Sequence, residues 1–291
     1  MAAYRFCRSD DIALLAEALN RCWAPYFPGE PPVTADAFKR TIRDLQVWCS
    51  SCMVAFAGAD PIGVLIGAKR SSATLIHRIA VHPDHRREGH ARHMLASLSS
   101  KLAILGPPRM VAEVPETLAP ARSLFAAAGY LEEAVLTDYV LDGERGGAGT
   151  FNGTEAGRLV IPVTIDDLAA NGLLDETNSP VCWEHSIETL TARKDALAGL
   201  AVASDERIEA YVLYAKRDGQ TDIVSLRSLV DDGGARLEHL LARLRGSATG
   251  HVAYPKVHPA ELSKERLQGL AFSPAGSGTH RLYAARARSD A

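Results

Sequence analysis

The 291-residue sequence has little of several features that mark specialised classes of protein. Its five cysteines are few and odd in number, which argues against a disulfide scaffold. The apolar runs stay far below the ~20 residues of a membrane span, and the start, MAAYRFCRSDD, lacks a secretory signal. Lysine plus arginine (32) nearly balance aspartate plus glutamate (35), so no basic excess indicates nucleic acid. We expect a cytoplasmic protein with neither a nucleic-acid nor a membrane partner.

What is present is the composition of a globular protein, with 47% hydrophobic and 23% charged residues. The length is close to twice that of a domain of roughly 150 residues, which predicts two domains. A glycine-rich stretch at 143–157 cannot bury apolar surface and is typical of an exposed connector. We therefore expect a first domain at 1–142, a linker at 143–157 and a second domain at 158–291.

The two halves also resemble each other in sequence. The apolar run that ends in Ala68-Lys69-Arg70 returns as the run that ends in Ala215-Lys216-Arg217. Ala91-Arg92 has a counterpart in Ala235-Arg236, and Ala128-Gly129-Tyr130 one in Leu270-Ala271-Phe272. Three correspondences in the same order at a nearly constant offset suggest a duplicated domain.

Hydrophobic periodicity predicts a mixed α/β architecture for the first half, with adjacent early strands rather than strict alternation. Asp10 or Asp11 is expected to cap the first helix. The predicted helices are 12–19, 34–45, 89–105 and 119–128, and the predicted strands are 53–56, 62–68, 74–81, 110–114 and 132–141.

The segment IHRIAVHPDHRREGHARHMLASL, residues 76–98, carries the clearest chemical signal. A strand ends at Val81 and a turn leads into a helix that begins near Gly89. Unpaired amides at a helix start suit a phosphate group, and a glycine lets the backbone approach an anion closely. Arg86, Arg87 and Arg92 add positive charge. A plain surface loop fits this pattern as well, because short phosphate-loop patterns arise by chance.

The pattern Val-x-Pro-x-x-Arg-x-x-Gly-x-Ala, Val81 to Ala91, resembles the acetyl-CoA signature of the GNAT superfamily of N-acetyltransferases. The segment Ala121 to Tyr130 is similar to the late helix of that family. The resemblance covers about residues 4–141, and a weaker one covers 158–285. It implies two GNAT-type α/β (α+β) domains, each with a mixed, mostly antiparallel twisted sheet flanked by helices.

The resemblance also implies a site for acetyl-CoA as co-substrate. The pantetheine arm would lie along the strand at Ile79, Ala80 and Val81. The pyrophosphate would lie against the amides of Arg87 to Ala91, with Arg86 and Arg92 nearby. The residues expected to bind the cofactor are therefore Ile79, Ala80, Val81, Arg86, Arg87, Glu88, Gly89, His90, Ala91 and Arg92.

Two residues are the candidates for a catalytic base. His77 stands where members of the family often have a glutamate, and an imidazole with a pKa near ~6.5 suits proton transfer at neutral pH. Glu113, on the next strand, is the second candidate. A histidine that simply lines the groove is the competing interpretation of His77.

The sequence departs from the family pattern at two places. Phe125 replaces the tyrosine often credited with protonating the leaving thiolate, and Leu118 replaces an asparagine. Either another acid, for which Tyr139 is the candidate, protonates the thiolate, or the thiolate leaves toward water.

The second half is expected to be a degenerate copy without a cofactor. Aligning Gly233 and Ala235 with Gly89 and Ala91 places Asp231 and Asp232 in the phosphate loop. Two carboxylates there would repel a pyrophosphate.

Parts of the sequence also fit three other functions. Cys49 and Cys52 match a Trp-Cys-x-x-Cys redox motif, but they follow a helix and precede a strand, the reverse of the context that this chemistry needs. His82, His85, His90 and His93 have spacings that could suggest a metal, yet they lack the mixed ligand set of zinc sites, and no metal is expected. A non-catalytic acyl-CoA-binding or interaction protein is the alternative to the enzyme.

The function expected from the resemblance is transfer of an acetyl group from acetyl-CoA to a primary amine by direct attack on the thioester. The acceptor is expected to be a small molecule rather than a protein, and the chain a monomer or homodimer. Trp23, Tyr26 and Phe27 are candidates for a lid over the acceptor site.

Overall fold

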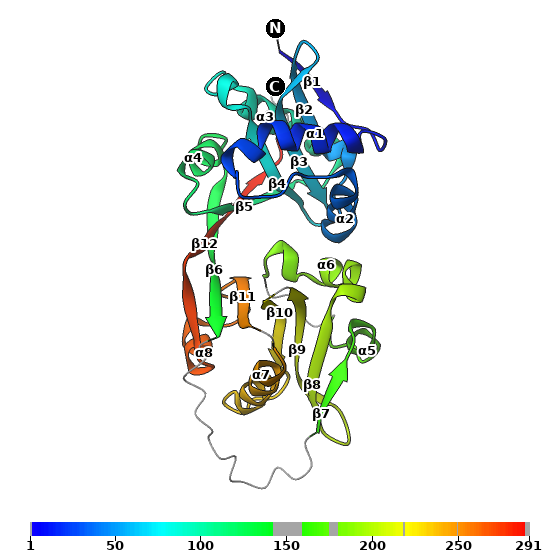
Figure 1. Cartoon of the computed structure of the whole chain (residues 1–291), viewed down its shortest axis with the longest axis vertical. Coiled ribbons are helices and arrows are strands. Elements are labelled where there is room, and N and C mark those ends of the chain that lie inside the picture. The colour runs from blue at the N-terminus through cyan, green and yellow to red at the C-terminus, as the bar shows by residue number, and fades with distance from the viewer. Residues whose placement is uncertain (1, 142–158, 175–179, 218, 249, 289–291) are drawn as a thin grey trace. The chain divides into compact units, whose positions relative to one another are not determined.

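The computed structural model describes residues 2–141, 159–174, 180–217, 219–248 and 250–288 (Figure 1). The predicted linker at 143–157 lies outside these residues. The chain forms two compact units, of which unit 1 holds residues 1–134 and 281–291 and unit 2 holds residues 135–280. Two strands, β6 (Leu131–Leu141) and β12 (Phe272–Arg286), each begin in one unit and end in the other. The division expected from the sequence, into 1–142 and 158–291, stays a prediction.

Unit 1 is a sheet with helices on both faces. The strands follow the order β1-β2-β3-β4-β5-β12-β6, with antiparallel pairing from β1 to β4 and parallel pairing between β4 and β5. Its elements are β1 (Ala3–Phe6), α1 (Ile12–Cys22), α2 (Ala35–Leu45), β2 (Met53–Ala57), β3 (Asp60–Lys69), β4 (Thr74–Val81), α3 (His90–Leu105), β5 (Arg109–Pro115), α4 (Ala119–Ala127), the start of β6 and the end of β12.

The alternation of side chains along β2 and β3 explains why both faces of this sheet are covered. Met53, Ala55 and Leu65 belong to a buried cluster with Met94 and Leu98 of α3. The residues between them point to the opposite face, since successive side chains of a strand alternate. Helix α1 packs against β3, and Figure 1 shows α1 and α2 together in front of the strands.

Unit 2 repeats this plan. Its strands follow the order β7-β8-β9-β10-β11-β6-β12, antiparallel from β7 to β10, parallel between β10 and β11, and antiparallel between β11 and β6. Its elements are the end of β6, β7 (Leu159–Val163), α5 (Ile165–Ala170), α6 (Ile187–Ala192), β8 (Ala198–Ala203), β9 (Ile208–Arg217), β10 (Gln220–Ser228), α7 (Ala235–Ser247), β11 (His251–Val257), α8 (Lys264–Gly269) and the start of β12.

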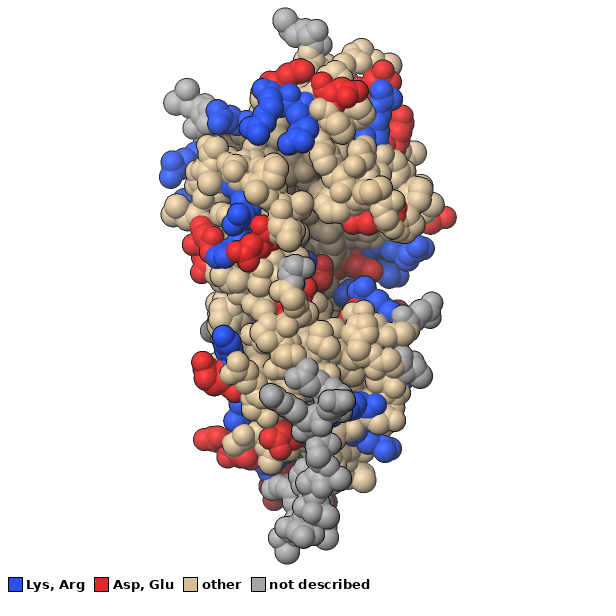
Figure 2. All heavy atoms as spheres, turned by 60° about the vertical axis from the view of Figure 1, so that its left-hand side comes forward, with Lys and Arg blue, Asp and Glu red and all other residues tan. Residues whose placement is uncertain are grey.

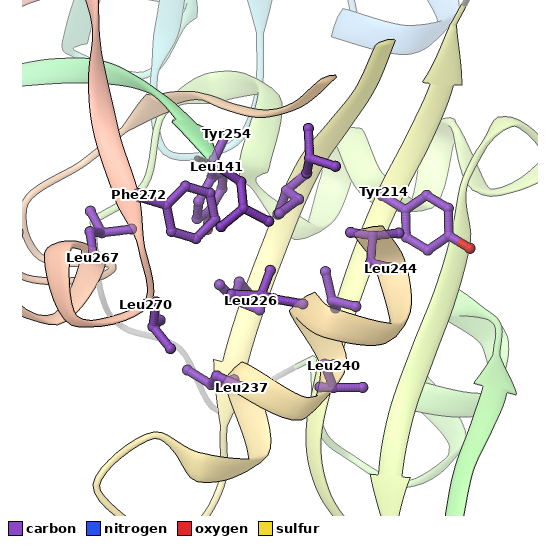
Figure 3. Close-up of a cluster of buried hydrophobic side chains, with 14 of the residues drawn as sticks. Leu141, Tyr214, Leu226, Leu237, Leu240, Leu244, Tyr254, Leu267, Leu270 and Phe272 are labelled. Atoms are coloured by element: carbon purple, nitrogen blue, oxygen red, sulfur yellow. The ribbon is translucent and has the colours of Figure 1, made fainter. Parts of the chain in front are cut away.

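The core of unit 2 forms where α7 meets the sheet. Figure 3 shows Leu237, Leu240 and Leu244 of α7 directed at the strands, with Leu226 of β10 among the side chains that they meet. The leucines recur three or four residues apart, so they share one face of the helix.

The repeated strand order confirms the predicted fold class of two mixed, mostly antiparallel α/β units. One of the sequence correspondences, Ala128-Gly129-Tyr130 with Leu270-Ala271-Phe272, also recurs in the backbone. Gly129 (φ 82°) and Ala271 (φ 63°) both adopt the left-handed conformation just before the last strand of their halves. A backbone turn that glycine adopts freely is therefore kept in the second half with alanine, at a steric cost.

Two local features differ from the expectations. Strand β1 was not predicted, because its four residues are too few to show a period. Asp11 stands at the start of α1 but does not cap it; its carboxylate accepts hydrogen bonds from the Arg5 guanidinium and the Arg8 amide instead. Thr34 caps α2, its side chain accepting from the Ala37 amide at 3.1 Å. None of the described helices is long and apolar enough to cross a membrane.

The end of β12 should be needed for unit 1 to fold. Tyr283 and Ala287 belong to its buried cluster, and the Arg281 guanidinium pairs with Glu116 and Glu132. We expect a chain that ends at His280 to lose at least about 3 kcal/mol of stability in unit 1, since a buried tyrosine and its neighbours are removed. A chain that ends at Arg288 is the control, and equal thermal unfolding of both would contradict this role.

Candidate functional site

A gap in strand pairing opens beside β4. The parallel pairs between β4 and β5 are Thr74 with Met110 and Leu75 with Val111, and no further pair joins the two strands. On its other edge β4 stays paired with β3 as far as Val81. The backbone of Ile79, Ala80 and Val81 therefore has one edge without a strand partner among the described residues, and buried backbone groups seek one. These are the residues predicted to lie along the pantetheine arm.

A β-bulge marks the position of His77. The pairing with β3 passes from Arg78 opposite Ile66 to Ile76 opposite Gly67, so His77 is the extra residue. A bulge redirects the side chain that it carries and often lies beside active sites. If the register of β4 with β5 were continued by two places, it would set His77 level with Glu113. The two predicted base candidates thus lie on the two strands that border the gap, and both are partly buried.

The loop after β4 leads to the start of α3 through two left-handed residues, Arg87 (φ 68°) and Gly89 (φ 86°). Open space surrounds the position where a side chain at Gly89 would begin. Among the described residues, no side chain accepts a hydrogen bond from the amides of Gly89, Ala91 or Arg92. This is the arrangement that an incoming anion needs. The side chains of Arg86, Arg87, Glu88 and Arg92 are exposed around it.

Unlike the arginines and Glu88 of the same loop, His90 has a buried side chain. Its Nδ1 lies 2.5 Å from the Tyr4 hydroxyl, and its Nε2 lies 3.1 Å from a carboxylate oxygen of Glu88. The imidazole is thus fixed by β1 on one side and by the loop on the other. What His90 offers to a phosphate at the helix start is its backbone amide.

The predicted lid residues contact β4. Tyr26 donates its hydroxyl proton to the carbonyl of Val81 at 2.7 Å, and the Arg86 guanidinium lies 5.7 Å from the centre of the Tyr26 ring. Trp23 stacks on Phe27 and receives Arg78 over its ring at 4.9 Å. The connection between α1 and α2 is therefore anchored on the strand that borders the gap.

Phe125 stands where the family pattern has a tyrosine that protonates the leaving thiolate, so its surroundings are of interest. Phe125 is buried, and the Tyr283 ring lies nearly parallel to it, 6.1 Å between centres. Tyr283 comes from the end of β12, so no local sequence signal could connect it with Phe125. Tyr139, the guess made from the sequence, lies in the apolar core of unit 2, paired with Tyr254 across two strands. The structure offers no support for Tyr139 as the acid.

The equivalent loop of unit 2 differs in one decisive respect. Helix α7 starts after Gly234 (φ 103°), so Gly234, not Gly233, is the counterpart of Gly89, and the alignment made from sequence is off by one residue. The Asp232 carboxylate accepts hydrogen bonds from the amides of Gly234 and Arg236, each at 2.9 Å, and pairs with the Arg236 guanidinium. A carboxylate of the chain itself therefore holds the amides that an anion would use.

A cavity of about 560 Å³ lies beside this loop in unit 2. It runs along the end of β10, which has its own bulge at Val224 in the position of His77. Apolar side chains line much of it, among them Leu226 and Leu237, whose positions Figure 3 shows. Val224 at this bulge carries no titratable group, unlike His77, and Asp232 already accepts from the amides of the helix start.

A buried polar cluster of unit 2 was missed from the sequence. Glu261 lies 3.1 Å from Nδ1 of His185 and accepts a hydrogen bond from the Tyr254 hydroxyl at 3.0 Å. Despite the desolvation of the imidazole, Cys182 and Glu261 raise the pKa of His185. The partners stand 76 residues apart, so no motif could have indicated the pair.

The Trp-Cys-x-x-Cys motif lacks the environment of a redox site. Cys52 is fully buried, and burial raises the pKa of its thiol. Burial also raises the pKa of Cys49. A reactive cysteine needs a stabilised thiolate, which these surroundings disfavour. The structure therefore favours the interpretation of both as packing residues.

Charged side chains of both signs are interspersed on the face that Figure 2 shows, as the balanced composition predicts.

In each unit a parallel pair of strands parts beside the start of a helix. Residues 13–130 match the acetyltransferase (GNAT) family, which confirms the resemblance of this part of the chain to that family that the sequence predicted. No protein of curated function matches the sequence.

Solved structures show the fold for the whole chain. A tandem GNAT protein from the clavulanic acid biosynthesis pathway is 17% identical, with a TM-score of 0.65 and 99% of both chains covered. A GCN5-related N-acetyltransferase from Sphaerobacter thermophilus is 13% identical, with a TM-score of 0.67, over 99% of this chain and 96% of that one. A GCN5-related N-acetyltransferase from Anabaena variabilis is 13% identical, with a TM-score of 0.66, over 99% of this chain and 73% of that one.

The buried cluster of unit 2 should contribute to stability. Replacing Glu261 with alanine leaves His185 and Tyr254 without their partner, and we expect a loss of about 3–5 kcal/mol, as for a broken buried ion pair. Chemical unfolding measures it. Glu265→Ala, an exposed carboxylate in the same helical region, is the matched control. A loss no larger than that of the control would show that the cluster is not a stabilising one.

Proposed function

We propose that the chain is an acetyl-CoA-dependent N-acetyltransferase whose single active site lies in unit 1. The observation that carries the proposal is the combination of an unpaired β4 edge with open amides at the start of α3. The edge offers peptide groups to an extended amide-containing arm, and the helix start offers donors to its pyrophosphate. Both belong to one continuous segment, Ile79 to Arg92, as the length of a CoA molecule requires.

The reaction proposed is direct transfer. The acceptor amine attacks the thioester carbonyl, the new C–N bond forms, and the C–S bond breaks to release CoA as a thiolate. His77 accepts the proton that the amine loses, and Glu113 on the facing strand is the second candidate for this role. The lid residues Trp23 and Tyr26, anchored on β4, would enclose a small-molecule amine.

Unit 2 is proposed to be a degenerate copy that binds no CoA. Asp232 already satisfies the amides of its helix start, and an added pyrophosphate would meet the carboxylates of Asp231 and Asp232. The neighbouring Arg236 offers no compensation, since its guanidinium is buried between Asp232 and Glu209.

A protein that binds acyl-CoA without turning it over is the second candidate, favoured by Phe125 in the place of a tyrosine. Release of free CoA in the presence of an amine distinguishes the two. Such release, followed over a panel of small amines, supports the enzyme, and binding without release over the whole panel supports the alternative.

The first prediction concerns binding. Calorimetric titration with acetyl-CoA should give one site per chain, and Gly89→Asp should abolish it, because an aspartate adds negative charge and blocks the backbone approach. Gly58→Asp is the matched control, as Gly58 also has positive φ and open space around it. Two sites would overturn the proposed role of unit 2, and an unchanged dissociation constant in Gly89→Asp would overturn the site.

The second prediction concerns catalysis. His77→Ala should lower kcat by about 10²–10⁴-fold, the usual contribution of a general base, and leave acetyl-CoA affinity unchanged. In the wild type, kcat/KM should rise with pH as the base loses its proton, and the variant should lose that rise. His251→Ala, an exposed histidine of β11, serves as control. Unchanged turnover across pH would exclude His77 as the base.

A further inference from the structure

The loop after β4 gathers three groups that are common metal ligands. One ligand atom each from His85, Glu88 and His90 lies within 4.8 Å of the other two. The sequence suggested the pairs His82 with His85 and His90 with His93, but the structure joins one histidine of each pair. Of the two acidic residues that accompany these histidines in the sequence, Asp84 and Glu88, it brings in Glu88. Two imidazoles and a carboxylate form a ligand set that zinc uses in proteins.

One pair of ligand atoms already has the separation that a tetrahedral ion requires. Bonds of roughly 2.0–2.1 Å place two ligand atoms of such an ion about 3.3 Å apart. Nε2 of His90 and the nearest oxygen of Glu88 are 3.1 Å apart already. His85 ends the short helical turn Pro83–His85 and is partly exposed, so its side chain is the one that would close the set.

The burial of His90 gives the set a fixed member. Its Nδ1 is held by the Tyr4 hydroxyl at 2.5 Å, which leaves Nε2 directed at Glu88. A partner on the second ring nitrogen orients a histidine ligand, and its removal typically weakens metal binding by about 10–100-fold. Tyr4 is therefore a positioning residue for this set.

We propose that His85, Glu88 and His90 form a site for a divalent transition-metal ion of the zinc class. We further infer that its occupancy strengthens acyl-CoA binding at the same loop, a step that rests on the proposed function. Glu88 and His90 flank Gly89, so the ion and a pyrophosphate at the helix start would lie side by side. Opposite charges at that separation attract, and coupling between two ligands is reciprocal.

The test uses the full-length protein freed of metal by a chelator, with zinc alone as the probe. Calorimetric titration at neutral pH should show one ion per chain. His85→Ala and Glu88→Gln should each weaken it by at least about tenfold, and Tyr4→Phe by about 10–100-fold. His251→Asn is the control, since His251 is an exposed histidine of β11 and should not matter. Cobalt(II), whose visible absorption reports tetrahedral coordination, gives a second readout.

Zinc binding without acetyl-CoA tests the site independently of the proposed function. No saturable zinc binding, or binding that His85→Ala and Glu88→Gln leave unchanged, would overturn the site. A second titration in saturating acetyl-CoA tests the coupling, and we expect zinc to bind several-fold more tightly there. Unchanged or weaker affinity would overturn the coupling, whereas failure of acetyl-CoA to bind in the absence of zinc and in its presence would count against the proposed function instead.

Discussion

The structure of unit 1 depends on one interruption of backbone hydrogen bonding. β4 and β5 pair through Thr74 and Leu75 and then part, while a bulge at His77 changes the course of β4. A parallel pair that stayed joined would leave no peptide groups for a ligand. Because it parts, the chain can bind an extended molecule by its backbone and carry two titratable side chains, His77 and Glu113, at the borders of the gap.

The same interruption exists in unit 2, where β10 carries a bulge and pairs with β11 over Gln220 to Asp222. What differs is the polar chemistry beside it. In unit 1 the helix start has no side-chain partner among the described residues, whereas in unit 2 a carboxylate two residues before Gly234 takes its place. A helix N-terminus stabilises whichever negative charge reaches it first. A covalently attached aspartate is always present, and on this ground we propose that unit 2 does not bind a ligand of the same charge.

Much of the fold followed from sequence pattern, and the exceptions share one physical origin. The predicted helices and strands of the first half agree with the structure to within a few residues, because their periods are long enough to read. β1 has only four residues, and its contribution appears through Tyr4, whose partner His90 lies 86 positions away. Tyr283 beside Phe125 and Glu261 beside His185 are contacts of the same kind. Contacts between distant residues leave no trace in a local pattern.

The predicted site residues illustrate the same limit within a single loop. Sequence pattern grouped residues 86–92 by their role in a known signature, which treats each side chain as equivalent. The structure divides them: Arg86, Arg87 and Arg92 are exposed, while His90 is buried against Tyr4. Burial fixes the imidazole, and a fixed imidazole beside a carboxylate differs chemically from a mobile one. The loop therefore offers two sets of ligands, backbone amides on one side and His85, Glu88 and His90 on the other, and only the three-dimensional arrangement distinguishes them.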